Sequence, residues 1–223
     1  MKICIVGTGP TYEQAPWDDP SWKIWCMAHR LNHFKRIDVG FEMHKHADLV
    51  ELGVDYLDWL DAPTIPVYTR WPSNYPACKP YPLEDAIKLM GREYFTSSFS
   101  YMICKAILDG AKEIGLYGID LSADDEYSYQ RPGAEYLIGL AQGKGIKITI
   151  AKGSALLNAP FVYGDGQPMT SNPLMVMYEK RLASCKGEIK RVSCELDQLT
   201  GAEHELQEFI KTLKDVERGA LKE

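Results

Sequence analysis

Short apolar runs alternate with amphipathic segments over the first 150 residues of the chain. Runs rich in β-branched and aromatic residues predict strands over residues 2–6, 22–27, 36–43, 64–68, 113–118 and 145–151. Apolar positions at helical spacing predict helices over residues 47–60, 82–90, 98–109 and 134–142. This alternation predicts an α/β fold, with a Rossmann-like, doubly wound, mostly parallel sheet and helices on both of its faces.

The stretch from Tyr94 to Leu121 is the most informative part of the pattern. A small hydroxylic loop precedes a helix, and Ser97 or Ser98 is a suitable N-cap for that helix. A buried strand follows the helix, and Asp120 comes just after the strand. Ligands of open α/β sheets lie outside the carboxyl ends of the strands, so we expect these three side chains at one rim. The alternative is that the serines only cap the helix and Asp120 only caps a turn.

A glycine turn follows the first strand directly. Its residues are Gly7, Thr8, Gly9 and Pro10. A strand that leads into such a turn is where doubly wound domains hold a phosphate or a ribose. The spacing does not match the dinucleotide fingerprint, which has three glycines.

The polar segment after the central strand carries a cluster of carboxylates, which are Asp120, Asp124, Asp125 and Glu126. Such a cluster can bind Mg²⁺ together with a phosphate ligand. The alternative is a solvated loop. Tyr129 and Arg131 follow, and Arg131 suits a phosphate because its guanidinium donates two parallel hydrogen bonds.

Four histidines, His29, His33, His44 and His46, fall in the first quarter of the chain. His29 and His33 would share a face only in a helix, whereas their neighbours predict strand and loop. His44 and His46, two residues apart, could chelate an ion. We see no carboxylates with metal-ligand spacing beside these histidines, so the sequence predicts no metal site. His44, at the carboxyl end of a predicted strand, is the candidate for a ligand contact or a base.

The character of the chain changes near residue 170. Apolar residues there recur at spacings of three and four, which is a heptad pattern that Glu203 interrupts. They are Leu182, Cys185, Ile189, Val192, Leu196, Leu199, Leu206, Ile210 and Leu213. Either one long helix or a hairpin folded near Gly201 fits this pattern. We therefore divide the chain into a Rossmann-like domain at 1–165 and a helical extension at 170–223, through which we expect a homo-oligomer.

Charge and composition exclude several classes of protein. A net charge of −6 argues against nucleic acid as the main partner. No apolar run approaches the roughly 20 residues that span a bilayer. The first strand begins at Lys2 without the features of a signal peptide, and the six cysteines are scattered. Free thiols of this kind fit a reducing compartment, so we expect a cytoplasmic protein.

The glycine turn, the Thr96-Ser97-Ser98 loop and the strand ending in Gly118-Ile119-Asp120 occur in an order that resembles a known family. The chain resembles the bacterial lipooligosaccharide sialyltransferases, glycosyltransferase family 42. It equally resembles the motility-accessory-factor and hydroxymethylpterin-diphosphokinase-like domains. The resemblance covers about residues 1–160. Small stand-alone members of this wider group are common in phage genomes, which suits a chain of this size.

The resemblance implies a Rossmann-like fold that binds a nucleotide. By this resemblance the turn from Gly7 to Pro10 would cradle phosphate and ribose, Ser97 would meet the nucleotide, and Asp120 would close the site. The family has asparagine where Thr8 stands, and another where this chain has Met27-Ala28. The stretch 129–132 matches the position of the family's catalytic histidine but contains none. Another group, such as His44 or Asp120, would then activate the acceptor.

Three functions remain open on these grounds. The first is a sialyltransferase-like transferase that uses a nucleotide or nucleotide sugar of the cytidine type, with Arg131 and the tyrosines, Tyr129 among them, neutralising the phosphate. The second is a non-enzymatic protein that binds or sequesters a nucleotide. The third is a diphosphokinase-like enzyme that uses Mg²⁺, although the sequence does not require this ion.

Overall fold

A computed structural model describes residues 1–121, 129–158 and 173–220. The chain divides into two compact units, Met1–Met169 and Thr170–Glu223. We call the first the α/β unit and describe each unit by itself.

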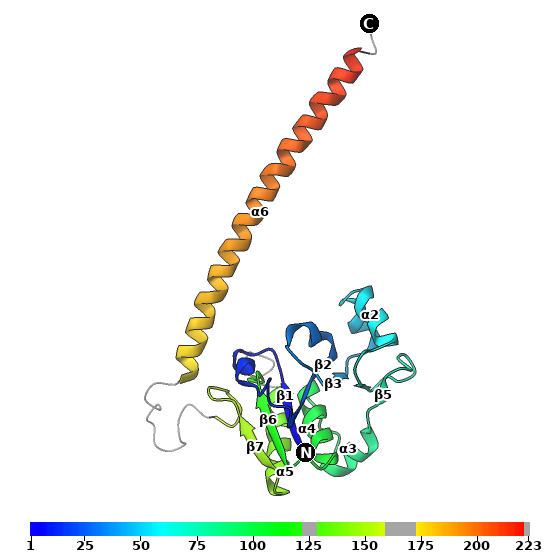
Figure 1. The fold of residues 1–223 in the computed structure, drawn as a ribbon, viewed down its shortest axis with the longest axis vertical. Helices are drawn as coiled ribbons and strands as arrows, with labels where there is room; N and C mark the ends of the chain where they lie inside the picture. Colours follow the sequence, from blue (N-terminus) through cyan, green and yellow to red (C-terminus); the bar gives the residue numbers. More distant parts are fainter. Residues whose placement is uncertain (122–128, 159–172, 221–223) are drawn as a thin grey trace. The chain divides into compact units, whose positions relative to one another are not determined.

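The α/β unit is built on one seven-stranded sheet whose strands all run parallel (Figure 1). Its spatial order is β5-β4-β3-β2-β1-β6-β7. The strands are β1 (Lys2–Val6), β2 (Trp22–Met27), β3 (Val39–Glu42), β4 (Val67–Thr69), β5 (Lys79–Pro80), β6 (Glu113–Tyr117) and β7 (Lys147–Ile150). The predicted α/β class is thus confirmed. The two-residue strand β5 was not predicted.

The chain winds outward from β1 through β2, β3, β4 and β5, and then returns to the other side of β1 for β6 and β7. The sheet therefore changes winding direction between β1 and β6. In doubly wound folds the crevice at such a switch point, outside the carboxyl ends of the strands, is where ligands bind.

Helices and single turns cover both faces of the sheet. Their bounds are η1 (Pro10–Gln14), η2 (Ala28–His33), α1 (His46–Val50), α2 (Val54–Asp61), α3 (Leu83–Met90), α4 (Ser98–Leu108) and α5 (Arg131–Gly143). The single helix predicted over 47–60 was wrong. Gly53 has φ 98°, a left-handed value that interrupts the helix and gives α1 and α2 instead. Helix α5 also begins at Arg131, earlier than the predicted residue 134.

Alternate side chains of the strands divide between two cores. Ile3 and Ile5 of β1 face the layer formed by α3, α4 and α5, in the largest buried cluster. Cys4 and Val6 face the opposite side, where Trp17 packs against them from the segment after η1. Because both faces are covered, the strands read as continuous apolar runs rather than as alternating ones.

The second unit contains α6 (Pro173–Ala220), one helix of 48 residues. The helix continues through Gly201, so the alternative of a hairpin folded there is wrong. In the described parts of the chain, no helix is both long enough and apolar enough to cross a membrane.

Candidate functional site

The glycine turn after β1 lies directly against the segment that follows β6. The amides of Gly7 and Gly9 donate to the carbonyls of Tyr117 (2.9 Å) and Gly118 (2.8 Å). In return, the Gly118 amide donates to the Thr11 hydroxyl at 2.8 Å. A Cβ on Gly7 would lie 2.4 Å from the Gly118 carbonyl oxygen. The glycines are therefore required by the close approach of two backbones, independently of any ligand.

A pocket of about 480 Å³ opens beside this turn, at the carboxyl ends of β1, β2 and β3. We call it the carboxyl-edge pocket. It is lined by Thr8, Met27, His29, Arg30, Met43, His44, Phe95, Thr96, Ser97, Ser98, Phe99, Tyr101 and Gln130. The structure thus brings together five of the residues singled out in the sequence, namely Thr8, His44, Thr96, Ser97 and Ser98.

One wall of the pocket is the beginning of α4. Ser97 is its N-cap, and its Oγ accepts a hydrogen bond from the Ser100 amide at 3.2 Å, as the sequence predicted. The Thr96 hydroxyl donates to the Gln130 carbonyl at 3.0 Å and so ties this loop to the start of α5. A Cβ on Gly133 would lie 2.1 Å from the Thr96 Oγ1, so the glycine permits this contact. The first turn of α4 adds a partial positive charge to this wall.

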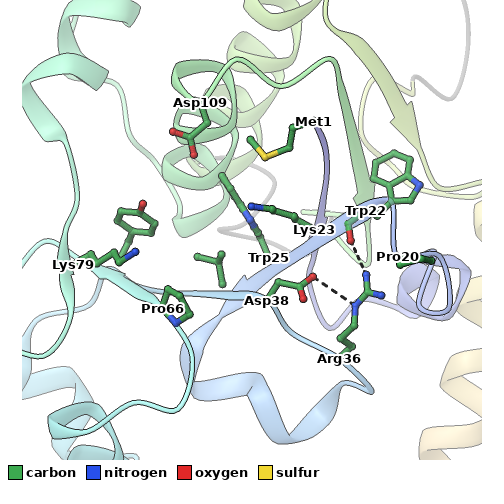
Figure 2. A pocket seen from close by; sticks show the side chains of 12 residues that line it. Met1, Pro20, Trp22, Lys23, Trp25, Arg36, Asp38, Pro66, Lys79 and Asp109 are labelled. Atoms are coloured by element: carbon green, nitrogen blue, oxygen red, sulfur yellow. Dashed lines mark hydrogen bonds and ion pairs between the residues drawn. The ribbon is translucent and has the colours of Figure 1, made fainter.

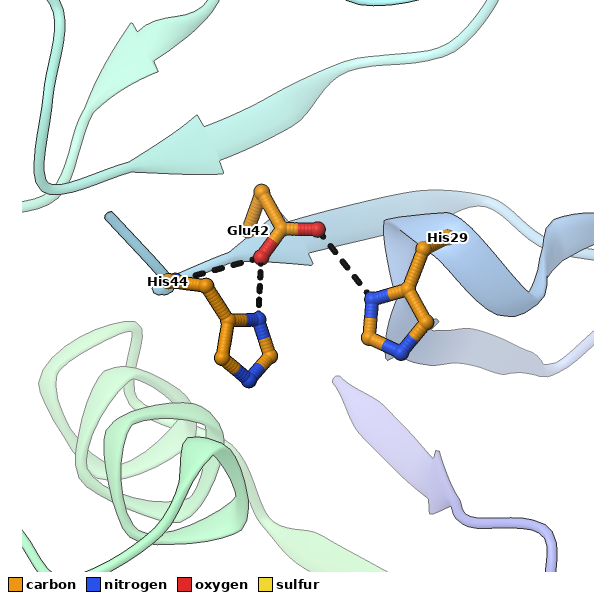
Figure 3. A group of neighbouring side chains, drawn as sticks. All are labelled: His29, Glu42 and His44. Carbon is orange, nitrogen blue, oxygen red and sulfur yellow. Dashed lines mark hydrogen bonds and ion pairs between the residues drawn. The ribbon is translucent and has the colours of Figure 1, made fainter. Parts of the chain in front are cut away.

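A second wall carries a cluster of two histidines on one carboxylate (Figure 3). Glu42, the last residue of β3, is fully buried. His44 Nδ1 lies 2.6 Å from its Oε1, and His29 Nδ1 lies 3.2 Å from its Oε2. The Tyr56 hydroxyl donates to Oε2 at 2.5 Å. Figure 3 shows both imidazoles with Nδ1 towards Glu42 and Nε2 directed away from it. We call this group the Glu42 cluster.

These hydrogen bonds keep Glu42 ionised. Burial alone would raise the pKa of this carboxyl, but the donors His29, His44 and Tyr56 together lower it to about 2. The hydrogen bond to Glu42 in turn raises the pKa of His44, against the opposing effect of partial burial. Burial, followed by the nearby Glu42 charge, raises the pKa of Tyr56, so it remains a donor. With Glu42 ionised, each Nδ1 carries a proton and the Nε2 of a neutral ring is an acceptor.

The same three side chains also form a donor set suited to a transition metal. One ligand atom from each of His29, Glu42 and His44 lies within 4.8 Å of the others. The sequence interpretation paired His29 with His33, whereas the structure places His29 beside His44, with ring centroids 5.4 Å apart. The hydrogen bonds in the structure assign Glu42 the role of orienting both rings.

The other candidates from the sequence do not line the carboxyl-edge pocket. Asp120 is buried, at 6% exposure, but its carboxylate lies against the glycine turn, with Oδ2 2.6 Å from the position that a Cβ on Gly9 would take. Tyr129 is 70% exposed and does not line the pocket either. Arg131 donates from Nε to Glu135 Oε1 at 2.7 Å and from Nη2 to the Asn158 carbonyl at 3.0 Å. The remaining carboxylates of the predicted acidic cluster, at 124–126, lie outside the described residues.

A second cavity of about 480 Å³ lies at the opposite, amino edge of the sheet (Figure 2). Arg36 lines this cavity. Its Nη2 donates to the Trp22 carbonyl at 2.7 Å, and its Nε lies 3.5 Å from Asp38 Oδ2. Asp38 in turn accepts from the Ile24 amide at 2.7 Å. These charges hold the start of β2 in place, so we assign them a structural role. The carboxyl edge, where parallel sheets bind ligands, is the better candidate for a functional site.

Sequence reasoning missed Glu42, His29 and Tyr56 as members of the site. One signal was present. A glutamate within an apolar run, two residues before His44, is expensive to bury unless it has partners. Its partner His29 is 13 residues away in the sequence, and only the pairing of β2 with β3 brings the two together.

Comparisons with known proteins give a fold and no sequence family. No family model matches the chain, and no curated protein matches it in sequence. Among solved structures, the sialyltransferase CstII from Campylobacter jejuni, in complex with the substrate analogue CMP-3FNeuAc, is similar with a TM-score of 0.50 at 15% identity. The match covers 70% of this chain and 82% of that one. The similarity shows that the chain shares its α/β fold with this sialyltransferase.

Two further structures of the sialyltransferase are similar at a lower level. The complex with a trisaccharide acceptor and CMP has a TM-score of 0.46 at 15% identity, over 73% of this chain and 89% of the other. The Campylobacter jejuni complex with cytidine-5'-monophosphate has a TM-score of 0.45 at 16% identity, over 72% and 88%. The match with a TM-score of 0.50 confirms the fold that the motif resemblance implied. At these identities it shows the fold alone.

Proposed function

We propose that the chain is a nucleotide-sugar-dependent transferase that binds a cytidine-type donor in the carboxyl-edge pocket. The observation that carries the proposal is the Glu42 cluster, which directs histidine side chains towards a pocket at the ligand-binding edge of a sialyltransferase fold. The CstII structure with the same fold was solved with CMP-3FNeuAc. That ligand supports the choice of donor class for this chain.

The pocket offers several groups for the phosphate of such a donor. The start of α4 provides backbone amides and the positive end of the helix dipole. Thr8 and Ser98 add hydroxyls, and the exposed Arg30 adds a guanidinium. Arg30 takes the place that the sequence interpretation gave to Arg131, because the Arg131 side chain is committed to Glu135 and to the Asn158 carbonyl. Because the Arg30 side chain is exposed, it would gain a fixed position only when it bonds a phosphate.

We assign the role of base to His44. The acceptor hydroxyl oxygen would form a bond to the anomeric carbon of the donor while the bond from that carbon to the phosphate oxygen breaks. The hydroxyl proton would pass to Nε2 of His44, and the nucleotide monophosphate would leave with the bonding electron pair. Glu42 holds the ring in the required tautomer and stabilises the imidazolium that forms. His44 thereby supplies the histidine that the family pattern places elsewhere.

The first test measures cytidine nucleotide binding by calorimetry and release of CMP from a CMP-sugar by chromatography. The wild type should bind CMP and release it from the donor. His44→Gln should retain CMP binding but lose about 100- to 10,000-fold in turnover. Because the pKa of His44 is raised, turnover in the wild type should increase as the pH rises through that pKa. His46→Gln is the matched control, since His46 instead bonds the Tyr75 hydroxyl.

Other outcomes separate the alternatives. CMP binding without turnover in any donor panel would make the chain a nucleotide-binding protein rather than an enzyme. Strict Mg²⁺ dependence of nucleotide binding would favour the diphosphokinase-like alternative. Absence of binding to every cytidine nucleotide would refute the proposal. Thr8→Val is a better probe of binding than Ser97→Ala, because Ser97 also caps α4.

A further inference from the structure

Helix α6 exposes an apolar seam with one polar interruption. We define the α6 seam as Leu182, Cys185, Ile189, Val192, Leu196, Leu199, Leu206, Ile210 and Leu213. Its eight aliphatic side chains are between 50% and 69% exposed, and Cys185 is exposed as well. Most helical stability in proteins comes from packing an apolar face, and a helix of 48 residues gains none from a seam left in water.

The spacing of the seam specifies the kind of partner. The residues recur at intervals of three and four, apart from one interval of seven across Glu203. The resulting average of 3.5 places Leu182, Ile189, Leu196 and Ile210 at a positions and the others at d positions. A strict 3.5-residue repeat follows a straight line only when the helix supercoils to the left around another helix of the same period. The surface of a globular domain would instead match a broader stripe with the 3.6-residue period.

We propose that the α6 seam pairs with the α6 seam of a second copy of this chain, in a parallel, in-register, two-stranded coiled coil. Between residues 182 and 214 there are five basic and six acidic residues, so two copies bring together segments with a net charge of only −1 each. Two of the four apolar a positions are isoleucine and the other two are leucine, and three of the five d positions are leucine. Isoleucine at a together with leucine at d favours two parallel strands.

The seam is also long enough for a stable dimer. Positions a, d, e and g number 19 per copy between residues 182 and 214. Standard stable interfaces use about 20 residues on each side. The repeat also exceeds the three to four heptads that distinguish a coiled coil from a chance pattern.

One a position within the α6 repeat is polar and bears on the register. Glu203 stands at the a position between Leu196 and Ile210. A single polar residue at an a position costs stability but selects one alignment. In register, the two Glu203 side chains share one layer. A shift by one heptad, or an antiparallel pairing, would set each of them against an apolar layer and so disrupt two layers instead of one.

The two exposed cysteines of α6 provide a test of orientation and register in the full chain. Cys185 occupies a d position, whereas Cys194 occupies the outward f position. Parallel, in-register pairing brings each Cys185 opposite its copy, within disulfide range. Under mild oxidation, Cys194→Ser should form a disulfide-linked dimer and Cys185→Ser should not. The other four cysteines are buried and do not compete.

The mass and the seam are tested under reducing conditions by sedimentation equilibrium. The expected mass is twice that of the 25.2-kDa chain. Leu196→Asp should raise the dissociation constant at least about 100-fold, because it buries a charge in the seam. Glu203→Leu should tighten the dimer about tenfold or more. Glu205→Leu, at an outward c position, is the control that should not tighten it.

Three results would overturn the proposal. A monomeric mass at the highest concentration reached would remove the second copy. A trimer or tetramer would remove the two-stranded arrangement. A dimer in which Cys185 fails to cross-link, or in which Cys194 cross-links equally well, would remove the parallel, in-register alignment.

Discussion

The α/β unit buries its apolar side chains within the same chain, whereas α6 leaves the apolar side chains of its seam exposed. In the α/β unit, Ile3 and Ile114 are fully buried between the sheet and the helices of the same chain. In α6, Leu199 and Ile189 are each 69% exposed. The contrast separates a unit that packs within its own chain from a helix whose seam, in the dimer that we propose, packs against a second chain. A change in the α/β unit should therefore alter an unfolding step that does not depend on protein concentration, and a change in α6 should alter one that does.

The largest effect that we expect in the α/β unit comes from Gly118→Ala. Gly118 has φ 63°, and a Cβ there would lie 2.2 Å from the Gly7 carbonyl oxygen and 2.8 Å from its carbonyl carbon. Left-handed strain and overlap with rigid backbone add together, so the substitution should cost about 4 kcal/mol or more of unfolding free energy. Urea titration followed by tryptophan fluorescence measures it.

Gly139→Ala is the control for that measurement. Gly139 lies in α5, and nothing lies within 4 Å of the position that a Cβ would take there, so alanine should be neutral or stabilising. A Gly118→Ala protein that unfolds at the wild-type urea concentration would contradict the tight approach of the two turns. Association through α6 should be unchanged in both variants.

A smaller effect, dependent on pH, comes from Glu42→Gln. Because its hydrogen bonds outweigh burial, the pKa of Glu42 falls from 4.5 to about 2. A lowered folded-state pKa gives stability that is present above pH 4.5 and is lost as the pH falls towards 2. The difference corresponds to about 3 kcal/mol. The stability gap between wild type and Glu42→Gln should therefore shrink over that range, as measured by urea titration at each pH.

His44 adds a second pH-dependent change, or limb, to the curve of unfolding free energy against pH. Its raised pKa contributes stability that is present below 6.5 and is lost as the pH rises through the folded-state pKa. The two residues share one hydrogen bond, so the gap between wild type and Glu42→Gln should be largest between the two limbs. Glu84→Gln, at an exposed carboxylate in α3, should show neither limb. A gap that stays constant with pH would refute the ionised Glu42.

The sequence predicted those parts of the fold that depend on local pattern. Six of the strands follow from apolar runs, and the cap at Ser97 follows from a hydroxyl beside an apolar helix. The sequence prediction failed where the backbone conformation of one residue decides whether a helix continues. The pattern over 47–60 is continuous, yet Gly53 adopts φ 98° and ends the helix. Periodicity in side chains does not report such a break.

The candidate site was harder to predict because its contacts are not local. The glycine turn suggested a phosphate cradle, whereas the structure shows that Gly7 and Gly9 also admit the backbone at Gly118, more than 100 residues away. His44 was singled out by its place after a strand, but its partners Glu42 and His29 acquire their meaning only from the β2–β3 pairing. The Arg131 guanidinium was chemically suited to a phosphate. In the structure it instead forms an ion pair with Glu135, one helical turn away.

The smallest effect that we expect is a change in the thermal transition of α6 alone, without a change in that of the α/β unit. Gly201 lies within α6 at an outward f position, and nothing lies within 4 Å of a Cβ placed there. Gly201→Ala should therefore stabilise the helix by about 1 kcal/mol per chain, through helix propensity alone. Circular dichroism should show the concentration-dependent transition moving to a higher temperature, with the transition of the α/β unit unchanged. Gly187→Ala, also at an f position, should repeat the result. Gly201→Ala could instead lower the temperature of the concentration-dependent transition while Gly187→Ala raises it. Gly201 would then be a point at which the helices of the proposed dimer need to bend.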